Sequence, residues 1–348
     1  MKETMKALVY HGPEKISLDE VPVPKLIKPD DAIVRVTTST ICGTDIHIWH
    51  GGMPEVQPPR ILGHEFCGEI VEVGPAVRNV KVGDRVAVSC VTQCGECFYC
   101  KRGTYSHCVT GSWIFGYMID GCQAEYVRVP HANLGCHIIP ENLTDEDVLF
   151  VGDILSTGYF GAENARIEPG SVVAVMGSGP VGMCAMATAR LFGPSKIIAV
   201  DTIQSRLDFV VKQGWADIGL NPQDCDIVEE IKKLSHGRGA DACIEAVGVT
   251  PTFKYALEAV RPGGRVSVVG VFEKPFELEM NRLWIKNITI SMGLVNANRI
   301  PELIDLISAG KLDMTPLITH RAPLEDILKG YDVFGGKKDN VIKWVVTY

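Results

Sequence analysis

The sequence predicts a two-domain α/β chain, in which a doubly wound parallel sheet follows an irregular, barrel-like β domain. Short apolar runs broken by glycine and proline extend from residue 7 to about residue 129, a spacing typical of an irregular β barrel. From Ser171 onward, apolar runs of strand length alternate with helical patterns, as in a parallel sheet covered by helices. The chain has 348 residues, 46% of them hydrophobic, which is enough for two such cores.

Charge and cysteine content narrow the class of protein. The net charge is −8 and no run of lysine or arginine occurs, which argues against nucleic acid or an anionic membrane as a partner. The N-terminus does not resemble a signal peptide, and no apolar stretch is long enough for a transmembrane helix. Twelve cysteines in such a chain fit a reducing compartment, where spaced clusters bind metal. We therefore expect a soluble cytoplasmic protein whose partner is a small molecule.

The first domain is predicted from strand-length runs at residues 7–10, 32–37, 68–73, 84–88 and 124–129, with no helical period between them. A helical pattern follows at residues 143–165, and Thr144 is its expected N-cap.

The second domain is predicted from strands at residues 172–176, 196–200, 218–220, 241–245, 265–269 and 287–292, with helices between them. Two further helices, 299–309 and 324–334, and a strand at 341–347 are expected to return to the first domain. The expected domains are therefore residues 1–152 with 294–348, and residues 153–293.

A glycine-rich turn predicts a dinucleotide site. Gly177, Gly179 and Gly182 form a G-x-G-x-x-G pattern between an apolar strand and a helix, where a pyrophosphate can approach the backbone and the helix N-terminus. Asp201 ends the second strand, where a carboxylate accepts hydrogen bonds from ribose hydroxyls and repels a 2′-phosphate, so we expect NAD over NADP. Arg206 argues against this preference, because a guanidinium could bind the 2′-phosphate of NADP. Other expected cofactor contacts are Pro180, Val181, Thr157, Val247 and Gly270.

Four cysteines predict a structural zinc site within a lobe at residues 90–110. Their spacing is C-x2-C-x2-C-x7-C, and four thiolates complete a tetrahedral shell with no open position. An iron–sulfur cluster is the chemical alternative. The four are Cys94, Cys97, Cys100 and Cys108. Cys90 precedes the set and is not needed to complete it.

A second group of donors predicts a catalytic metal. The segment C-G-T-D-I-H begins at Cys42, and G-H-E follows at residues 63–65. A thiolate with neutral imidazoles suits zinc that keeps an open coordination position. Cys42 and His64 are the expected ligands.

Together these motifs resemble the zinc-containing alcohol dehydrogenases of the medium-chain dehydrogenase/reductase superfamily. Residues 63–77, G-H-E-F-C-G-E-I-V-E-V-G-P-A-V, match that family's zinc signature, and the resemblance covers the whole chain. It implies a GroES-like catalytic domain and a Rossmann NAD-binding domain. It also implies that Asp153 is the third protein ligand, and that Glu65 is either a displaceable fourth ligand or lies just behind the metal.

The resemblance also implies an activity. Thr44 and His47 match the family's proton-relay positions, and Trp113 resembles a substrate-pocket residue. An Asp at position 153 resembles the pattern of the microbial secondary-alcohol dehydrogenases and of the formaldehyde dehydrogenase branch. We expect reversible hydride transfer between a secondary alcohol and NAD, with two zinc ions per chain. Formaldehyde, butanediol, polyol and threonine dehydrogenases are the alternatives within the superfamily. A nucleotide-binding structural relative is the non-enzyme alternative, and the family suggests a homotetramer.

Overall fold

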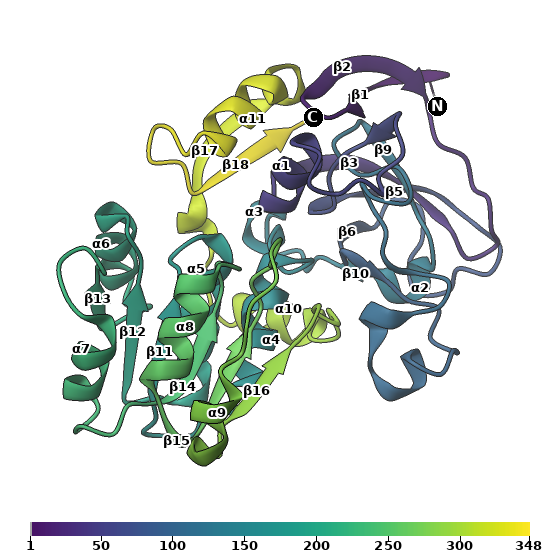
Figure 1. Cartoon of the computed structure of the whole chain (residues 1–348). Helices are drawn as coiled ribbons and strands as arrows, with labels where there is room; N and C mark the ends of the chain where they lie inside the picture. Colours follow the sequence, from purple (N-terminus) through teal and green to yellow (C-terminus); the bar gives the residue numbers. More distant parts are fainter. Residues whose placement is uncertain (1) are drawn as a thin grey trace. The chain divides into compact units, whose positions relative to one another are not determined.

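A computed structural model describes residues 2–348 and divides them into two compact units (Figure 1). Unit 1 contains the chain as far as Ser156 together with Val295–Tyr348, and unit 2 is Thr157–Leu294. Within residues 2–348, no helix combines the length and the apolar character that a membrane span requires.

Unit 1 is built on a seven-stranded sheet in the order β10-β6-β5-β3-β18-β17, with β9 also paired to β3. These strands are β3 (Ala32–Thr40), β5 (Phe66–Val73), β6 (Arg85–Val88), β9 (Tyr126–Val129), β10 (Cys136–Ile138), β17 (Ile318–Pro323) and β18 (Lys343–Thr347). A three-stranded sheet, β2-β1-β4, consists of β1 (Thr4–Gly12), β2 (Lys15–Pro22) and β4 (Arg60–Ile61). A two-stranded sheet pairs β7 (Val91–Thr92) with β8 (Ser112–Trp113).

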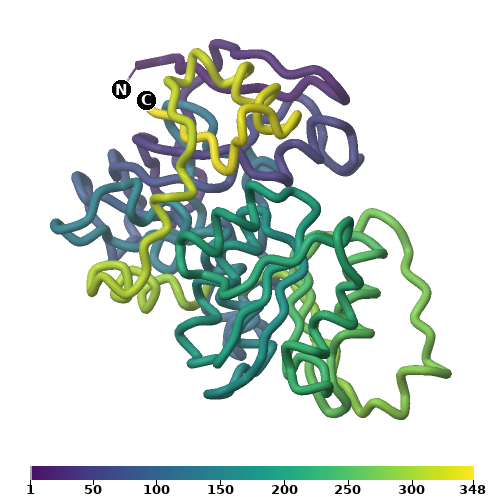
Figure 2. The backbone as a smooth tube through the Cα atoms, turned by 90° about the vertical axis from the view of Figure 1, so that its left-hand side faces the viewer, coloured from purple at the N-terminus to yellow at the C-terminus, as the bar shows by residue number. Residues whose placement is uncertain are grey.

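The C-terminal segment completes the unit 1 sheet. Strand β18 pairs antiparallel with β3, with Val345 opposite Thr40, and parallel with β17. Figure 2 shows this segment in yellow beside the purple N-terminal strands, and helix α11 contacts β2. Residues from both ends of the chain therefore share one core, in which Leu8 and Val346 are fully buried.

The helices of unit 1 correct two sequence-based expectations. Helix α1 (Gly43–Trp49) lies in a stretch predicted to lack helical periods, and it begins with a capping box between Cys42 and Asp45. The single helix expected at residues 143–165 is two helices, α3 (Asp145–Val148) and α4 (Ile154–Asn164), although Thr144 is the N-cap as predicted. The turn between them presents Asp153. Helix α4 begins in unit 1 and continues into unit 2 from Thr157 onward. The other unit 1 helices are α2 (Ala132–Gly135), α10 (Ile300–Ser308) and α11 (Ile327–Gly335), with 3-10 turns at Cys100–Arg102, Tyr105–His107, Thr315–Leu317 and Leu324–Asp326.

Unit 2 is the predicted doubly wound sheet, six parallel strands in the order β13-β12-β11-β14-β15-β16. Its strands are β11 (Val172–Met176), β12 (Lys196–Val200), β13 (Ile218–Leu220), β14 (Ala240–Glu245), β15 (Val260–Val268) and β16 (Thr289–Met292). Its helices are α5 (Pro180–Ala189), α6 (Gln204–Lys212), α7 (Ile227–Leu234), α8 (Thr250–Ala259) and α9 (Met280–Leu283), with 3-10 turns at Arg190–Phe192 and Trp284–Lys286. The strand order reverses beside β11, and ligands bind at such switch points in open parallel sheets.

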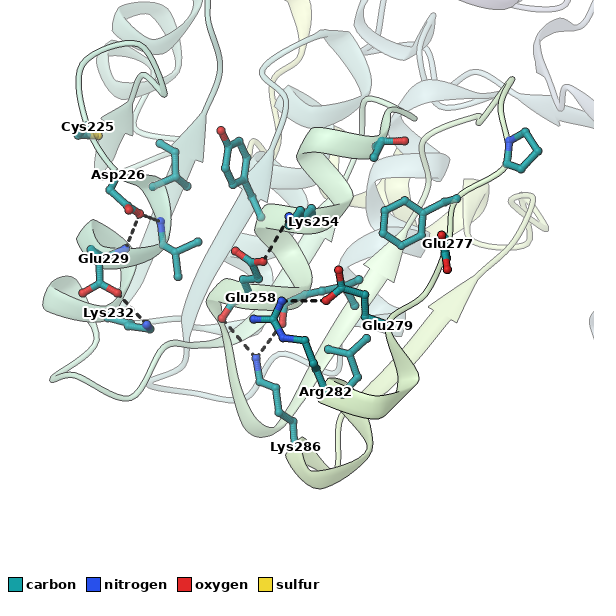
Figure 3. A pocket seen from close by; sticks show the side chains of 18 residues that line it. Cys225, Asp226, Glu229, Lys232, Lys254, Glu258, Glu277, Glu279, Arg282 and Lys286 are labelled. Atoms are coloured by element: carbon teal, nitrogen blue, oxygen red, sulfur yellow. Dashed lines mark hydrogen bonds and ion pairs between the residues drawn. The ribbon is translucent and has the colours of Figure 1, made fainter.

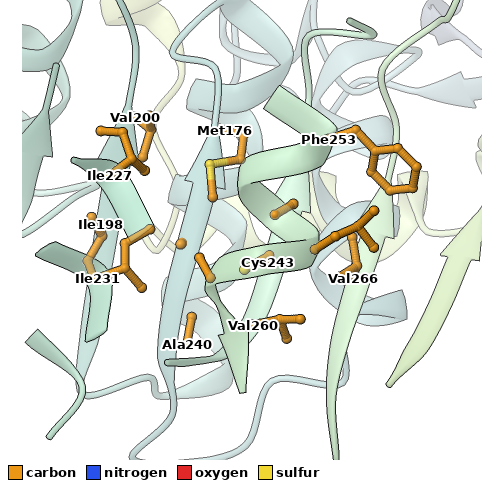
Figure 4. Packing of buried hydrophobic residues seen from close by; sticks show 14 of the residues in the cluster. Met176, Ile198, Val200, Ile227, Ile231, Ala240, Cys243, Phe253, Val260 and Val266 are labelled. Atoms are coloured by element: carbon orange, nitrogen blue, oxygen red, sulfur yellow. The ribbon is translucent and has the colours of Figure 1, made fainter. Parts of the chain in front are cut away.

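One apolar cluster anchors α7 and α8 to this sheet (Figure 4). Ile227 and Ile231 are four residues apart, so they lie on one face of α7, and both are buried. Phe253 of α8 and Met176 of β11 belong to the same cluster. Burying a side chain of this size contributes about 1.5–3 kcal/mol, so the cluster holds α7 and α8 against the sheet.

Candidate metal centres and nucleotide site

Four buried or half-buried side chains of unit 1 converge on one point. Cys42 precedes α1, His64 and Glu65 precede β5, and Asp153 precedes α4. One donor atom from each of these side chains lies within 4.8 Å of the donor atoms of the other three. Sequence positions more than 100 residues apart are thus brought together by the turns at the ends of three elements.

The imidazole of His64 is held between two carboxylates. Its Nε2 lies 3.2 Å from Oδ2 of Asp153, and its Nδ1 lies 3.3 Å from Oδ1 of Asp45. Oδ2 of Asp45 accepts a hydrogen bond of 2.9 Å from the backbone N–H of Cys42. A metal-binding histidine is commonly oriented by a carboxylate on its other ring nitrogen, and Asp45 occupies that position.

This network continues into the C-terminal segment. The side-chain amide of Gln123 donates to Oδ2 of Asp45 at 3.1 Å. The hydroxyl of Tyr331, in α11, donates to Oε1 of Gln123 at 2.7 Å. Asp45, Gln123 and Tyr331 are all fully buried, so the orientation of Asp45 depends on hydrogen bonds that water does not replace.

Glu65 forms a buried ion pair. Nζ of Lys343, at the start of β18, lies 2.8 Å from Oε1 of Glu65 and also donates to the carbonyl of Ile41 at 3.0 Å. Burial raises the pKa of Glu65 to about 7, although Lys343 opposes the shift. The second oxygen, Oε2, has no hydrogen-bond partner among the described residues.

Cys90 lies at this cluster and not among the four cysteines that follow it. Its Sγ lies 3.6 Å from Oδ1 of Asp153, while Sγ of Cys42 lies 3.8 Å from Oδ2. Burial raises the pKa of Cys90 well above its usual value, so the thiol keeps its proton and donates to the carboxylate. The two oxygens of Asp153 therefore have different surroundings.

The donor set fits a zinc ion. A thiol, an imidazole and two carboxylates provide the nitrogen, sulfur and oxygen atoms that zinc binds. The buried Oε2 of Glu65 has no hydrogen-bond partner among residues 2–348, and a buried polar atom in that state is stabilised when it binds a cation. We conclude that Cys42, His64, Asp153 and Glu65 could hold the metal.

The predicted relay and pocket residues surround the same cluster. Thr44 is in the first turn of α1, where its Oγ1 lies 3.9 Å from Sγ of Cys42, and His47 is one turn further along. Trp113 packs edge-on against His64, with ring centroids 5.7 Å apart. It also stacks on Tyr117 at 5.0 Å and 12°. An aromatic pair therefore forms an apolar wall beside the donor atoms.

The four cysteines of the lobe form the second donor cluster, again with all four sulfurs within 4.8 Å of one another. The backbone N–H of Cys100 points at Sγ of Cys97 at 3.5 Å, and such hydrogen bonds lower the pKa of Cys97 to about 6. The backbone N–H of Cys94 points at Sγ of Cys108 at 3.2 Å. Backbone N–H groups aimed at sulfur stabilise thiolates, which are the form that binds zinc.

The predicted glycine turn follows β11 at the switch point of the unit 2 sheet. A Cβ at Gly182 would lie 1.9 Å from the carbonyl oxygen of Gly177, so only glycine allows this approach of helix and strand. Oδ2 of Asp201 accepts from the N–H of Ser178 at 2.7 Å and Oδ1 from the N–H of Ile203 at 2.9 Å. Asp201 thus ties the turn to the end of β12, and it is not the N-cap of α6.

The other predicted cofactor residues lie on several elements of unit 2. The guanidinium of Arg206, in α6, comes within 3.9 Å of the Cβ position at Gly179. Pro180 and Val181 open α5, and Thr157 lies in α4. Val247 lies beside Gly177, whose Cβ would come within 2.4 Å of its side chain, and Gly270 lies beside Gly248.

A cavity of about 730 Å³ in unit 2 contains none of the predicted site residues (Figure 3). Its charged groups pair with one another, as Lys232 with Glu229 and Arg282 with Glu279, each at 2.8 Å. Nζ of Lys286 donates to the carbonyl of Leu257 at 2.7 Å. These cations are already neutralised or hydrogen-bonded, so the cavity is a poor candidate for the active site.

Sequence reasoning missed the residues that support the donors. They are Asp45, Cys90, Gln123, Tyr331 and Lys343. Asp45 lies within the C-G-T-D-I-H segment, and its spacing as the third residue of a helix could have revealed it. The others act through long-range contacts.

The fold and the donor clusters define the class as a metal-dependent dehydrogenase. Residues 28–141 match the alcohol dehydrogenase GroES-like domain family, and residues 180–309 match the zinc-binding dehydrogenase family. The chain belongs to the zinc-containing alcohol dehydrogenases of the medium-chain dehydrogenase/reductase superfamily.

Individual relatives agree with this assignment. An alcohol dehydrogenase of Cupriavidus necator is 41% identical over 363 residues, covering 99% of this chain and 98% of its own. A zinc-dependent alcohol dehydrogenase from Streptococcus pneumonia is 42% identical with a TM-score of 0.93, covering 99% of this chain and 98% of that structure. An alcohol dehydrogenase from Thermus sp. ATN1 is 39% identical with a TM-score of 0.92, covering 99% of each chain.

Proposed function

We propose that the protein is a zinc- and NAD-dependent dehydrogenase that interconverts a secondary alcohol and its ketone. Family membership makes it an oxidoreductase that acts on CH–OH donors. The observation that carries the proposal is the convergence of Cys42, His64, Glu65 and Asp153 in a chain that also has the glycine turn of a dinucleotide site. Relatives that only bind nucleotides have no need of such a donor set.

The proposed zinc ligands are Cys42, His64 and Asp153. Glu65 is a fourth donor, one of whose oxygens is paired with Lys343. Zinc held by these residues would supply Lewis-acid chemistry that lowers the pKa of an alcohol hydroxyl. Asp45 fixes the ring of His64 for this role, since it lies 3.3 Å from Nδ1.

The proton of the alcohol needs a path to solvent. The Thr44 hydroxyl, 3.9 Å from the sulfur of Cys42, is near enough to the donors to accept it. His47 follows on the same helix and is half-buried, so it can pass the proton outward. An imidazole can both accept and donate a proton, which suits this role.

The hydride acceptor in this proposal is NAD, whose nicotinamide supplies the redox chemistry. The backbone N–H groups at the start of α5 would bind the pyrophosphate. Asp201 would bind the ribose hydroxyls and disfavour the 2′-phosphate of NADP. Arg206 lies close to Gly179, which favours a contact with the pyrophosphate and leaves Asp201 to decide the cofactor.

The expected substrate is small and partly apolar. The stacked pair of Trp113 and Tyr117 beside His64 would contact the substituents of a secondary alcohol. Butanediol, polyols, threonine and formaldehyde are the competing substrates. The four cysteines of the lobe would hold a second, structural zinc ion, and we expect a homotetramer in the cytoplasm.

The test is a screen for NADH formation by zinc-loaded protein across secondary alcohols, diols, polyols, threonine and formaldehyde. Zinc content and the molar mass in solution are measured on the same sample. The proposal expects about two zinc ions per chain and the highest kcat/KM with a secondary alcohol. One zinc ion or none, without dehydrogenase activity on any substrate, would overturn it. A preference for a polyol or diol would replace the substrate and keep the chemistry.

A further inference from the structure

Glu245 is a buried carboxylate that the proposed mechanism does not use. It is the last residue of β14, and its side chain is fully buried. Burying a carboxylate away from water is costly unless hydrogen bonds satisfy it. Burial raises its pKa, whereas the hydroxyl of Thr252 and the N–H groups of Gly248 and Val247 oppose that shift.

The side-chain hydrogen bonds of Glu245 go to the loop that follows it and to Thr252 in the first turn of α8. Oε1 accepts from the N–H groups of Val247 and Gly248, both at 2.9 Å, and from the hydroxyl of Thr252 at 2.7 Å. Oε2 accepts from the N–H of Gly248 at 3.2 Å. Helix α8 has no side-chain cap at its first residue, so these bonds to Glu245 organise the turn into that helix.

The same loop presses against the glycine turn. A Cβ on Gly177 would lie 2.4 Å from Cγ2 of Val247, and one on Gly248 would lie 2.1 Å from the carbonyl oxygen of Val271. A Cβ on Gly270 would meet Oε2 of Glu245 at 2.4 Å. The loop is therefore closely packed on both sides, and a small displacement of its backbone would move the side chain of Val247 relative to the turn.

Glu245 has a counterpart on the other side of β11. The sheet order β12-β11-β14 places Asp201, just after β12, and Glu245, at the end of β14, on strands that flank β11. Asp201 anchors the glycine turn through the N–H of Ser178. In a doubly wound sheet the two halves of a dinucleotide lie on the two sides of this switch point. Asp201 stands on the adenosine side, so Glu245 stands on the other.

We propose that Glu245 is a positioning residue for the cofactor. It holds the loop of residues 246–249 in the conformation that receives the nicotinamide half of the dinucleotide. The inference rests on the proposed function, because it takes the ligand of the glycine turn to be NAD. The carboxylate holds two N–H donors of this loop, those of Val247 and Gly248, which an apolar side chain would leave unsatisfied.

The test compares two ligands on the zinc-loaded protein. NADH spans both sides of β11, whereas AMP occupies only the side of Asp201. For Glu245→Ala we expect the Kd for NADH to rise about tenfold or more, because a displaced loop loses contacts that depend on exact placement. The Kd for AMP should stay within about twofold of wild type, since the anchor at Asp201 is intact. Glu258→Ala, on the exposed face of α8, is the matched control and should bind both ligands as wild type does.

Two milder variants keep the inference testable if Glu245→Ala does not fold. Glu245→Gln retains one acceptor oxygen for the loop and should restore part of the NADH affinity. Thr252→Val removes the hydroxyl, which bonds Oε1 of Glu245 and the carbonyl of Val249, and should also have an intermediate effect on NADH alone. Equal weakening of NADH and AMP, or no change for NADH in any of the three variants, would overturn the positioning role. If the wild-type protein binds neither NADH nor NADPH, the proposed function itself is wrong.

Discussion

Nζ of Lys343 lies 2.8 Å from Oε1 of Glu65, and both side chains are buried within unit 1. Removing one partner of such a pair leaves an uncompensated charge. For Lys343→Met we expect a loss of about 3–5 kcal/mol in the free energy of unfolding, measured by denaturant titration. Lys338→Met, which breaks an exposed pair with Asp332, should cost less than about 1 kcal/mol. Equal effects of the two substitutions would contradict the buried ion pair.

The hydrogen-bond chain behind His64 predicts a coupling between α11 and the metal. Tyr331→Phe leaves the buried Oε1 of Gln123 without its donor, which should cost about 1–3 kcal/mol of stability. It should also weaken zinc retention at His64, by roughly tenfold, as outer partners of metal ligands do. Competition with a zinc chelator measures the second effect, with Tyr255→Phe in unit 2 as the control. Unchanged zinc retention would limit the chain to a structural role.

His137 in β10 predicts acid sensitivity. Burial lowers its pKa from 6.5 to about 4, so the native protein binds this proton less readily than the unfolded chain does. The stability that the neutral ring contributes is complete above about pH 6.5 and is lost as the pH falls through about 4. The loss should reach about 3 kcal/mol, and His137→Phe should remove it. Urea titrations of the wild-type protein and of His137→Phe across this pH range measure the loss of stability. An equal loss in the two proteins would contradict the prediction.

Asp201 predicts the choice of cofactor. Asp201→Asn keeps an oxygen that can accept from the N–H of Ser178 but removes the charge that repels a 2′-phosphate. The ratio of kcat/KM for NADP to that for NAD should rise about tenfold, since a close like charge is worth more than 1 kcal/mol. Asp208→Asn, on the exposed side of α6, is the control. An unchanged ratio in Asp201→Asn would remove this carboxylate from the ribose site.

The features that the sequence predicted well are local. The glycine turn and the four cysteines each lie within a short stretch, so their spacing and the strand and helix that flank the glycines were enough to predict where they lie. The parallel sheet was predicted because strands buried on both faces are continuous apolar runs, as β11 is. Helix α1 was missed because its seven residues are too few to show a clear period and its N-cap is a cysteine.

The features that could not be predicted depend on distant partners. Lys343 is 278 positions from Glu65, and Tyr331 is 208 positions from Gln123. A lysine in an apolar strand gives no sign of its partner until the strand is paired. Cys90 is four residues before Cys94, the first of the four clustered cysteines, yet its contact is Asp153, 63 positions away. Its neighbours in sequence point to the lobe, and only the fold brings it to the catalytic donors.

The measurement that tests the account most directly is the activity and zinc content of Asp153→Ala beside the wild-type protein. Asp153 lies 3.2 Å from His64 and 3.8 Å from Cys42, so the substitution should remove one donor from their cluster. The cluster of four cysteines should be unaffected. We predict that zinc falls from about two ions to about one per chain. NADH formation from the best alcohol should fall at least about a hundredfold, as removal of a metal-holding group does, while NADH binding persists. Full zinc content with undiminished turnover would contradict a zinc mechanism at this site.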